Sequence, residues 1–230
     1  MKGRLIVFEG VEGCGKTTQL QRSYQWLKPS LPVIVTREPG GTHLGSDLRQ
    51  LLLNIPEQPI YNSTELLLYA ADRSQHVEEL LKPELAKGTI ILCDRYVDST
   101  MAYQGYGRGL SRSLIEQLNN IATGGLESDL TIWLDIDVAV SLARKQQQRT
   151  SDCAFKSTGG DYVPRSTGGD RIEQEKIDFH RRVQQGYTEL AQANPQRIVR
   201  IDASNSEAEV QEQIQQILMQ RFPEIRSQSL

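Results

Sequence analysis

The 230-residue chain is poor in the residues that mark disulfide-rich, metal-binding and membrane proteins. It has only three cysteines, Cys14, Cys93 and Cys153, whose odd number and wide spacing argue against a disulfide framework and favour a reducing compartment such as the cytoplasm. The three histidines show no metal-ligand spacing. No apolar run approaches the roughly 18 residues of a membrane span. The N-terminal segment does not resemble a signal peptide either. We therefore expect no membrane partner.

Charge does not single out a partner. The formal net charge is −3, which gives no overall attraction to nucleic acid or anionic lipid, so we expect no nucleic-acid partner. Charged residues make up 24% of the chain and apolar ones 38%, which is ordinary for a soluble globular protein. The length predicts one domain, residues 1–230, with a core of useful size.

A phosphate-binding loop is the clearest feature that the sequence does contain. The apolar residues 5–8 predict a buried strand, and Gly10, Gly15, Lys16 and Thr17 then fit G-x-x-x-x-G-K-[ST]. Such a loop wraps main-chain N–H groups around phosphates, and a helix that begins near Lys16 adds its positive N-terminal end. The Lys16 ammonium can reach the outer phosphates and the Thr17 hydroxyl can ligate Mg²⁺. The motif predicts a bound nucleoside triphosphate and leaves the phosphate acceptor open.

Apolar strands and amphipathic helices alternate along the whole chain. Strands are predicted at residues 5–8, 33–36, 89–93, 130–135 and 197–202, and helices at 16–28, 44–53, 63–81, 111–121, 138–149, 172–193 and 208–221, with a short helix and a loop over 97–109. This order predicts an α/β fold whose five-stranded parallel sheet has helices on both faces. Ligands of such sheets bind at the carboxyl ends of the strands. The residues predicted at that edge are Glu9, Arg37, Asp94, Arg95, Asp135 and Asp202.

The helix predicted at 63–81 carries two patterns. Asn62, with Glu65 three residues later, is typical of a capped helix N-terminus. Tyr69, Arg73 and His76 lie at i, i+4 and i+7, which places them on one stripe. Tyr69 offers a ring for stacking and Arg73 a fork of donors, although a half-buried aromatic flanked by solvated charges has the same pattern.

The third predicted strand ends at Asp94 and Arg95. Phosphoryl transfer depends on positioning and on neutralising the charge of the transferring group. Arg95 is suited to an acceptor phosphate, and Asp94 to Mg²⁺ held through water or to an acceptor hydroxyl. A salt-bridged Asp–Arg pair at a strand end is the alternative.

Five segments, in order along the chain, resemble the motifs of thymidylate kinases: residues 8–18, 36–42, 71–76, 92–104 and 170–173. The resemblance extends over residues 3–205. It implies a P-loop kinase fold with a lid at about 144–171, and direct transfer of a phosphoryl group from ATP-Mg²⁺ to dTMP, giving dTDP. It also implies a homodimer. The alternatives are a kinase of another nucleoside monophosphate or of a deoxynucleoside. A GTP-dependent switch is disfavoured, because Asp94 is followed by Arg-Tyr-Val and no Asn-Lys pair occurs.

The resemblance also implies roles for individual residues. The predicted catalytic residues are Lys16, Glu12, Arg95, Asp94 and Arg149. The predicted ATP-binding residues are Gly10, Val11, Glu12, Gly13, Cys14, Gly15, Lys16, Thr17, Thr18 and Arg144, with the loop after Asp202 at the edge of the adenine site. Mg²⁺ is assigned to Thr17 and, through water, to Asp94. The predicted dTMP-binding residues are Arg37, Tyr69, Arg73, Arg95, Ser99, Thr100, Tyr103 and Gln104.

Three of these roles concern selectivity and one concerns the lid. By resemblance, Tyr69 stacks on thymine, Arg73 reads its O4, and Tyr103 lies where a ribose 2′-hydroxyl would clash. Residues 11–14 contain no arginine, so the family pattern in which the lid supplies an arginine fits. The candidates are Arg144, Arg149, Arg165 and Arg171. A repeated Ser-Thr-Gly-Gly-Asp, at 157–161 and 166–170, lengthens the predicted lid and leaves open which arginine reaches the phosphates.

Overall fold

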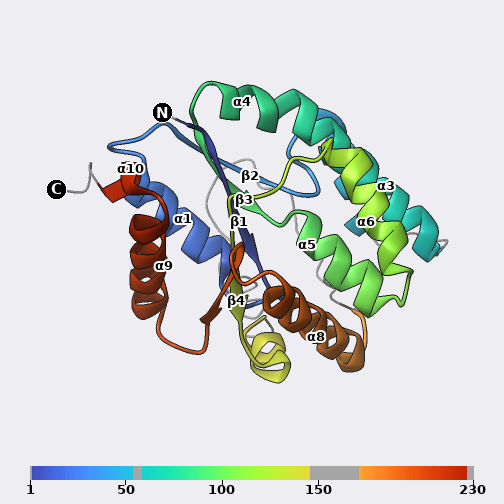
Figure 1. Ribbon diagram of the computed structural model, residues 1–230. Coiled ribbons are helices and arrows are strands. Elements are labelled where there is room, and N and C mark those ends of the chain that lie inside the picture. Colours follow the sequence, from blue (N-terminus) through green and yellow to red (C-terminus); the bar gives the residue numbers. More distant parts are fainter. Residues whose placement is uncertain (1, 54–58, 146–170, 173, 227–230) are drawn as a thin grey trace, which may run out of the picture.

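Five parallel strands form the centre of the molecule (Figure 1). The computed structural model describes residues 2–53, 59–145, 171–172 and 174–226. The strands are β1 Arg4–Glu9, β2 Val33–Arg37, β3 Ile90–Asp94, β4 Leu130–Asp135 and β5 Ile198–Asp202, and their order in the sheet is β2-β3-β1-β4-β5. All four strand pairs are parallel. The predicted α/β sheet and its five strands are therefore confirmed.

Successive side chains of β1 point to opposite faces of the sheet and are buried on both. Ile6 and Phe8 belong to the larger core, to which α1 (Lys16–Leu27) and α9 (Glu207–Arg221) contribute leucine, valine and isoleucine side chains. Leu5 and Val7 belong to a second core. In Figure 1, α1 and α9 lie on one side of the sheet, and α3, α5, α6 and α8 lie on the other. Both faces are covered, as a parallel sheet requires.

The remaining helices agree with the predicted pattern in most places. They are α2 His43–Leu53, α6 Arg112–Thr123, α8 Ile177–Ala193 and α10 Pro223–Arg226, and a further helix whose described part is 138–145. The Ser111 hydroxyl caps α6 by accepting a bond from the main-chain N–H of Leu114. The predicted helix at 172–193 begins later, at Ile177, and Ile172, which precedes it, is buried in the core.

The helix predicted at 63–81 is longer than predicted. α3 (Asn62–His76) was predicted to end at residue 81, but it continues through a π-helical turn, η1 (Val77–Leu81), into α4 (Lys82–Ala86). Pro83, which has no N–H to donate, lies at the start of α4, directly after this π-helical turn.

The loop predicted within 97–109 is also helical. It forms α5 (Val97–Thr100) and a π-helical segment, η2 (Met101–Gly107). The glycine that suggested a loop serves close packing, because a Cβ on Gly107 would lie 2.6 Å from the ring of Phe179 on α8.

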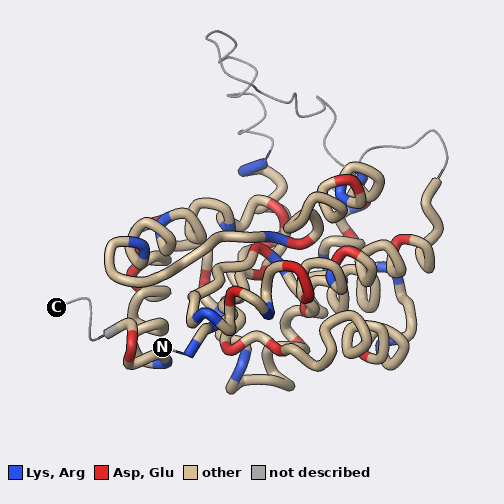
Figure 2. Tube along the Cα trace, turned by 90° about the horizontal axis from the view of Figure 1, so that it is seen from above, with Lys and Arg blue, Asp and Glu red and all other residues tan. Residues whose placement is uncertain are grey.

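Two further expectations concern the surface and the lid. Residues of both signs are interspersed over the described chain (Figure 2). None of the helices in the described part of the chain is long and apolar enough to cross a membrane. Most of the predicted lid, including Arg149 and Arg165, lies outside the described residues.

Candidate active site

The loop between β1 and α1 forms one wall of the site. Gly10 and Gly13 adopt φ angles of 142° and 77°, which L side chains rarely adopt. A Cβ on either glycine would lie 2.5 Å from a main-chain oxygen, that of Leu134 or that of Ser141. These glycines therefore let the loop pass close to β4 and to the helix at 138–145. Gly15 immediately precedes α1, so the helix begins with its free N–H groups at the loop.

Lys16 is held within this loop. Its Nζ donates hydrogen bonds to the main-chain oxygens of Gly10, at 3.0 Å, and Val11, at 3.1 Å. The side chain is only 7% exposed. Its partners are main-chain oxygens of the loop, and Thr17, the next residue, is exposed. The ammonium group is thus placed at the loop, where phosphate oxygens of a nucleotide would lie.

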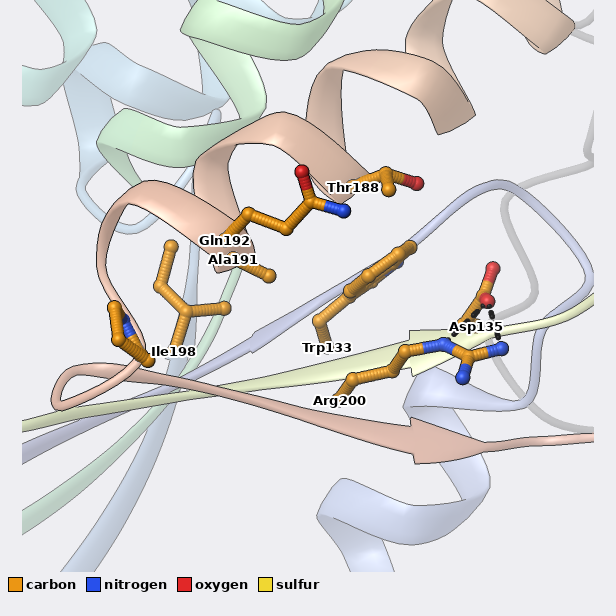
Figure 3. A pocket seen from close by; sticks show the side chains of 8 residues that line it. Trp133, Asp135, Thr188, Ala191, Gln192, Ile198 and Arg200 are labelled. Carbon is orange, nitrogen blue, oxygen red and sulfur yellow. Dashed lines mark hydrogen bonds and ion pairs between the residues drawn. The ribbon is translucent and has the colours of Figure 1, made fainter.

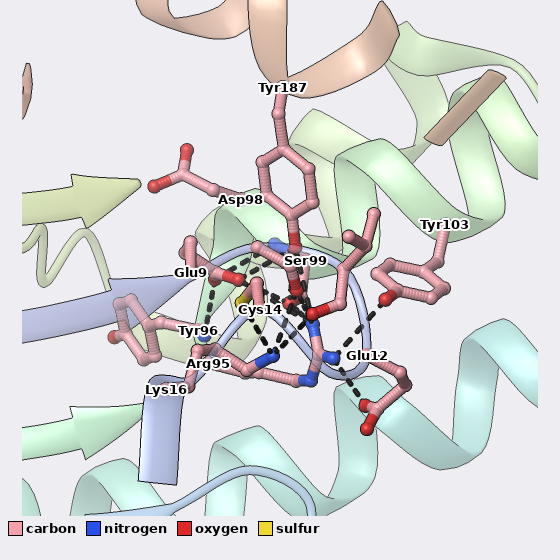
Figure 4. Close-up of polar contacts among 12 residues, drawn as sticks. Glu9, Glu12, Cys14, Lys16, Arg95, Tyr96, Asp98, Ser99, Tyr103 and Tyr187 are labelled. Carbon is pink, nitrogen blue, oxygen red and sulfur yellow. Dashed lines mark hydrogen bonds and ion pairs between the residues drawn. The ribbon is translucent and has the colours of Figure 1, made fainter. Parts of the chain in front are cut away.

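Arg95 lies opposite the loop and has the most partners in the site (Figure 4). Nη1 donates to the main-chain oxygen of Gly10 and to Ser99 Oγ, both at 3.1 Å, and Nη2 donates to Glu12 Oε1 at 2.6 Å and to the Tyr103 hydroxyl at 3.2 Å. Arg95 has a φ of 73°, the only positive value of a non-glycine residue in the described chain. Such backbone strain is concentrated at functional sites.

Glu12 is surrounded by cations. Besides Arg95, it contacts Lys145, whose Nζ lies 2.9 Å from Glu12 Oε2. Burial opposes ionisation of Glu12, but the nearby charges of Lys16, Arg95 and Lys145 hold the pKa of its carboxyl well below the usual range. The sequence reasoning did not assign Lys145. The only feature of the sequence that could have indicated a role for Lys145 is its position beside Arg144, at the polar end of the predicted helix.

A buried glutamate, Glu9, supports Arg95 from the other side (Figure 4). Its Oε2 accepts hydrogen bonds from Ser99 Oγ at 2.6 Å and from the Tyr187 hydroxyl at 2.7 Å, and its Oε1 accepts from the main-chain N–H of Tyr96 at 2.9 Å. Burial raises the pKa of Glu9 above its usual range. The sequence placed Glu9 at this edge without a role, and it provided no signal for Tyr187, which reaches the site from α8.

A pocket opens beside Arg95, and we call it the Arg95 pocket. Seven of the eight residues predicted to bind dTMP line it: Tyr69, Arg73, Arg95, Ser99, Thr100, Tyr103 and Gln104. Glu12 lines it too, as do residues that the sequence reasoning left unassigned: Glu38, Pro39, Arg49, Leu53, Tyr96 and Ile172. The pocket thus brings together side chains from the phosphate loop, β2–α2, α3, β3–η2 and the residues before α8.

Arg73 is fixed at one end of this pocket. It is 1% exposed, and its Nε donates to Glu38 Oε2 at 2.8 Å, its Nη1 to Asn119 Oδ1 at 2.7 Å and its Nη2 to the main-chain oxygen of Tyr96 at 3.1 Å. A guanidinium has five N–H groups, so donors remain for a ligand. His76, the third residue of the predicted stripe, contacts the other Glu38 oxygen at 2.9 Å. It therefore supports Glu38 and is not part of the pocket lining.

Asp72 lies beside this cluster. Its Oδ1 accepts from the main-chain N–H of Gly40 at 2.9 Å, and its buried Oδ2 has no hydrogen-bond partner in the described structure. Burial first, and the neighbouring Glu38 second, raise the pKa of Asp72 to about 6. The pKa of Asp72 in the folded state lies above the ordinary aspartate value of 3.8. Ionisation of Asp72 therefore lowers the free energy of unfolding of the wild type as the pH rises from 3.8 to about 6.

We therefore expect Asp72→Asn, which does not titrate, to become more stable relative to the wild type as the pH is raised. The relative gain between pH 4 and pH 7 should be roughly 2.4 kcal/mol, at 1.36 kcal/mol per unit of pKa shift, because part of the full effect is already present at pH 4. The measurement is urea unfolding of both proteins at the two pH values. A difference that does not change with pH would show that Asp72 titrates normally.

Apart from the phosphate loop, the predicted residues Arg37, Asp94 and Arg144 lie outside the pocket lining. Arg37 is exposed at the end of β2, next to Asp94 in the sheet register. Asp94 Oδ1 is buried and has no hydrogen-bond partner within the described ranges. Arg144 donates from Nη1 to the main-chain oxygen of Ala203 at 3.0 Å, which places it at the loop after β5.

A second pocket lies between β4, β5 and the end of α8 (Figure 3). An ion pair of Asp135 and Arg200, with 2.7 Å between Arg200 Nη2 and Asp135 Oδ2, lies beside Trp133 there. Asp135 was predicted at the ligand-binding edge, but its carboxylate is bound to Arg200 and to Gln184 on α8. It does not line the Arg95 pocket.

Comparison with known proteins agrees with this geometry. The family model for thymidylate kinase matches residues 8–214. A thymidylate kinase of Nostoc punctiforme is 63% identical, with 95% of this chain and 96% of the relative covered, and one of Cyanothece is 57% identical, with 96% of each covered. The crystal structure of a thymidylate kinase from Ehrlichia chaffeensis is similar, with a TM-score of 0.72 and 31% identity over 95% of this chain and 99% of that chain.

The chain belongs to the thymidylate kinase family. It is therefore a phosphotransferase with the P-loop kinase fold, as the resemblance implied. The alternatives, a kinase of another small acceptor and a GTP-dependent switch, are not favoured.

Membership of the thymidylate kinase family does not show which arginine of the lid reaches the phosphates. Arg149 and Arg165 lie outside the described residues. Arg171 donates from Nε to the main-chain oxygen of Leu52 at 3.1 Å and forms an ion pair with Glu65. Its guanidinium is thus bound to α2 and α3.

Proposed function

We propose that this thymidylate kinase family member transfers the γ-phosphoryl group of ATP to dTMP and releases ADP and dTDP. The observation that carries the proposal is the Arg95 pocket, which joins the phosphate loop to a compartment lined by the ring of Tyr69 and the guanidinium of Arg73. Arg95, at the loop end, is suited to the phosphate of dTMP. Tyr69 and Arg73, farther from the loop, are suited to the faces and the edge of thymine.

The reaction that we propose needs no covalent intermediate. A phosphate oxygen of dTMP attacks the γ-phosphorus, the bond to the bridging oxygen breaks, and ADP leaves. Lys16 and the N–H groups at the start of α1 stabilise the donor phosphates, while Arg95 neutralises the acceptor. Glu12, ion-paired with Arg95, orients that guanidinium and faces the acceptor sugar. The ring of Tyr103, beside Arg95, lies where it would exclude a 2′-hydroxyl.

Mg²⁺ is the metal that we propose for this reaction. The buried Asp94 Oδ1 without a partner and the exposed Thr17 at the loop suit such an ion, because Mg²⁺ is commonly bound by one or two protein oxygens, several waters and substrate phosphates. A bound Mg²⁺ would neutralise charge on the phosphates. Within the described ranges, no cluster of three or more His, Cys, Asp or Glu side chains has metal-ligand geometry.

A coupled assay of ADP release tests the proposed function. ATP-Mg²⁺ is offered with dTMP, dUMP, dCMP, dGMP, dAMP, TMP with a ribose sugar, and the deoxynucleoside thymidine. We expect dTMP to give the highest kcat/KM. Faster turnover of a purine nucleotide or of a deoxynucleoside would contradict the proposal.

The base-reading role of Arg73 can be measured separately. We expect Arg73→Ala to weaken dTMP binding roughly tenfold to 150-fold, because a hydrogen bond to a charged group contributes about 1.5–3 kcal/mol. Asn119→Ala is the matched control, since Asn119 contacts Arg73 but does not line the pocket. Calorimetric titration with dTMP gives both affinities. Equal, small losses in the two variants would argue against base reading by Arg73.

We also infer a homodimer. Large apolar side chains are exposed on three neighbouring helices: Leu44 and Leu51 on α2, Leu67 on α3, and Leu114 and Ile121 on α6. The α2 and α6 pairs are each spaced i, i+7 and so lie on one helix face. A second copy of the chain would cover this surface. Light scattering of the wild type and of Ile121→Glu tests it, with a dimer expected only for the wild type.

The cytoplasmic location stays a prediction.

A further inference from the structure

Glu65 does not have the helix-capping role that its position three residues after Asn62 predicted. The N-cap of α3 is Tyr61, and no side chain caps this helix, so the predicted Asn62–Glu65 cap is wrong. The Glu65 side chain is fully buried. It turns toward the interior, where a cluster of side chains from η2, its C-terminal flank and the residues before α8 receives it.

The carboxylate of Glu65 fixes the amide of Gln104. Gln104 Nε2 lies 2.7 Å from Glu65 Oε1. A carboxylate only accepts hydrogen bonds, so the NH₂ group of the amide must face Glu65. Gln104 lines the Arg95 pocket. The second N–H of that NH₂ group stays on the same side of the amide, and the carbonyl oxygen, which is the only acceptor of the amide, remains for a ligand.

Two arginines hold Glu65 in this orientation. Arg108 Nε lies 3.3 Å from Oε1 and Arg108 Nη2 lies 3.3 Å from Oε2, which also forms the ion pair with Arg171. Two guanidinium groups offset the cost of burying the carboxylate charge. Because both oxygens are engaged by cations, the carboxylate has little freedom to rotate away from Gln104.

Arg73 and Gln104 thus offer a donor and an acceptor to a base in this pocket. Arg73 can only donate, and Gln104 has its acceptor left. Thymine carries an acceptor, O4, next to a donor, N3–H, which complements this pair. Cytosine reverses both groups, because its 4-amino group donates and its N3 accepts. Each mismatch would leave a buried polar group without a partner.

We propose that Glu65 is a positioning residue for base selection. By setting the amide orientation of Gln104, it makes the pocket favour 4-keto pyrimidine nucleotides with an N3–H over 4-amino pyrimidine nucleotides. This proposal rests on the proposed function, because it assumes that the base of dTMP occupies the Arg73 end of the pocket.

The test is the ratio of kcat/KM for dTMP to kcat/KM for dCMP in a mutant cycle. In Glu65→Gln, the new amide can also donate to Gln104, so the Gln104 amide is free to turn. We expect the ratio to fall roughly tenfold, the loss expected for about one hydrogen bond. In Gln104→Met it should fall by a similar factor. Adding Glu65→Gln to Gln104→Met should then change the ratio no further.

A charge-conserving exchange provides rescue and guards against misfolding. In Glu65→Gln/Gln104→Glu, the amide at 65 donates to the carboxylate at 104, whose other oxygen still offers an acceptor to the pocket. We expect this double variant to recover the wild-type ratio to within about threefold. Gln104→Glu alone places two carboxylates together and should lose most of its activity with dTMP. Thermal unfolding of all variants identifies any that do not fold.

Three results would overturn the proposal. The ratio could stay at its wild-type value in Glu65→Gln while both substrates lose activity equally, which is the signature of a purely structural role. Glu65→Gln could lower the ratio further in the Gln104→Met background. The exchange variant could fold without recovering the ratio. If the wild type itself fails to use dTMP, the proposed function fails; if it uses dTMP and any of these results appears, only the role of Glu65 fails.

Discussion

Replacing Lys16 by alanine is expected to lower the rate of phosphoryl transfer by at least about 10²–10³-fold, the loss typical when a group that stabilises transition-state charge is removed. The fold should remain intact. Lys16 Nζ contacts only main-chain oxygens of its own loop and the sulfur of Cys14, so its loss removes no support between helices or strands. The missing ammonium leaves the charge on the donor phosphates without its main protein counter-ion.

Single-turnover transfer from γ-labelled ATP is the measurement for Lys16→Ala, with thermal unfolding as the test of folding. Lys28→Ala is the matched control, since Lys28 lies exposed at the far end of α1. It should behave as the wild type in both measurements. A folded Lys16→Ala protein that keeps most of its activity would be incompatible with a phosphate-binding role for this loop.

The second large effect is expected at the lid. Arg149→Ala should lower kcat by roughly 10³–10⁵-fold, or about 4–7 kcal/mol, while dTMP affinity changes little. Arg149 lies outside the described residues, so this prediction depends on its place at the end of the polar helix predicted at 138–149 and on the absence of arginine from residues 11–14. An arginine that binds only the transition state should affect kcat far more than KM.

Arg171→Ala is the informative comparison for this prediction. Its guanidinium contacts the main-chain oxygen of Leu52 and the carboxylate of Glu65, so we expect its loss to raise KM for dTMP more than it lowers kcat. Steady-state kinetics of both variants separates the two outcomes. If Arg171→Ala or Arg165→Ala loses kcat and Arg149→Ala does not, the lid arginine has been assigned to the wrong residue, while the mechanism stands.

The fold could be predicted well because its signals are local. Each strand is an apolar run followed by a polar or charged residue, and parallel strands buried on both faces need such runs. The errors came from residues with two structural uses. Gly107 is typical of a loop, yet in this fold it allows η2 to pack against Phe179. The helix predicted to end at residue 81 continues past Pro83, which follows a π-helical turn.

The residues of the candidate site also fall into two groups, those that the sequence predicted and those that it did not. The phosphate loop is a contiguous motif, so its residues could be predicted from the sequence alone. The Tyr187–Glu9 contact joins residues 178 positions apart, and such pairs follow from tertiary packing, which leaves no local pattern. Glu65 was misassigned because the spacing typical of a cap is also the spacing of any buried acid on the first turn of a helix.

A crystal structure with dTMP and an unreactive ATP analogue tests the central claim most directly. We expect the phosphate of dTMP on Arg95, the thymine ring against Tyr69, O4 within hydrogen-bond distance of Arg73 and N3 facing the carbonyl oxygen of Gln104. The triphosphate should lie on Lys16 and the loop of residues 10–17. If dTMP instead bound with its base at Arg95, or in the pocket beside Trp133, the proposed mode of substrate binding would be wrong.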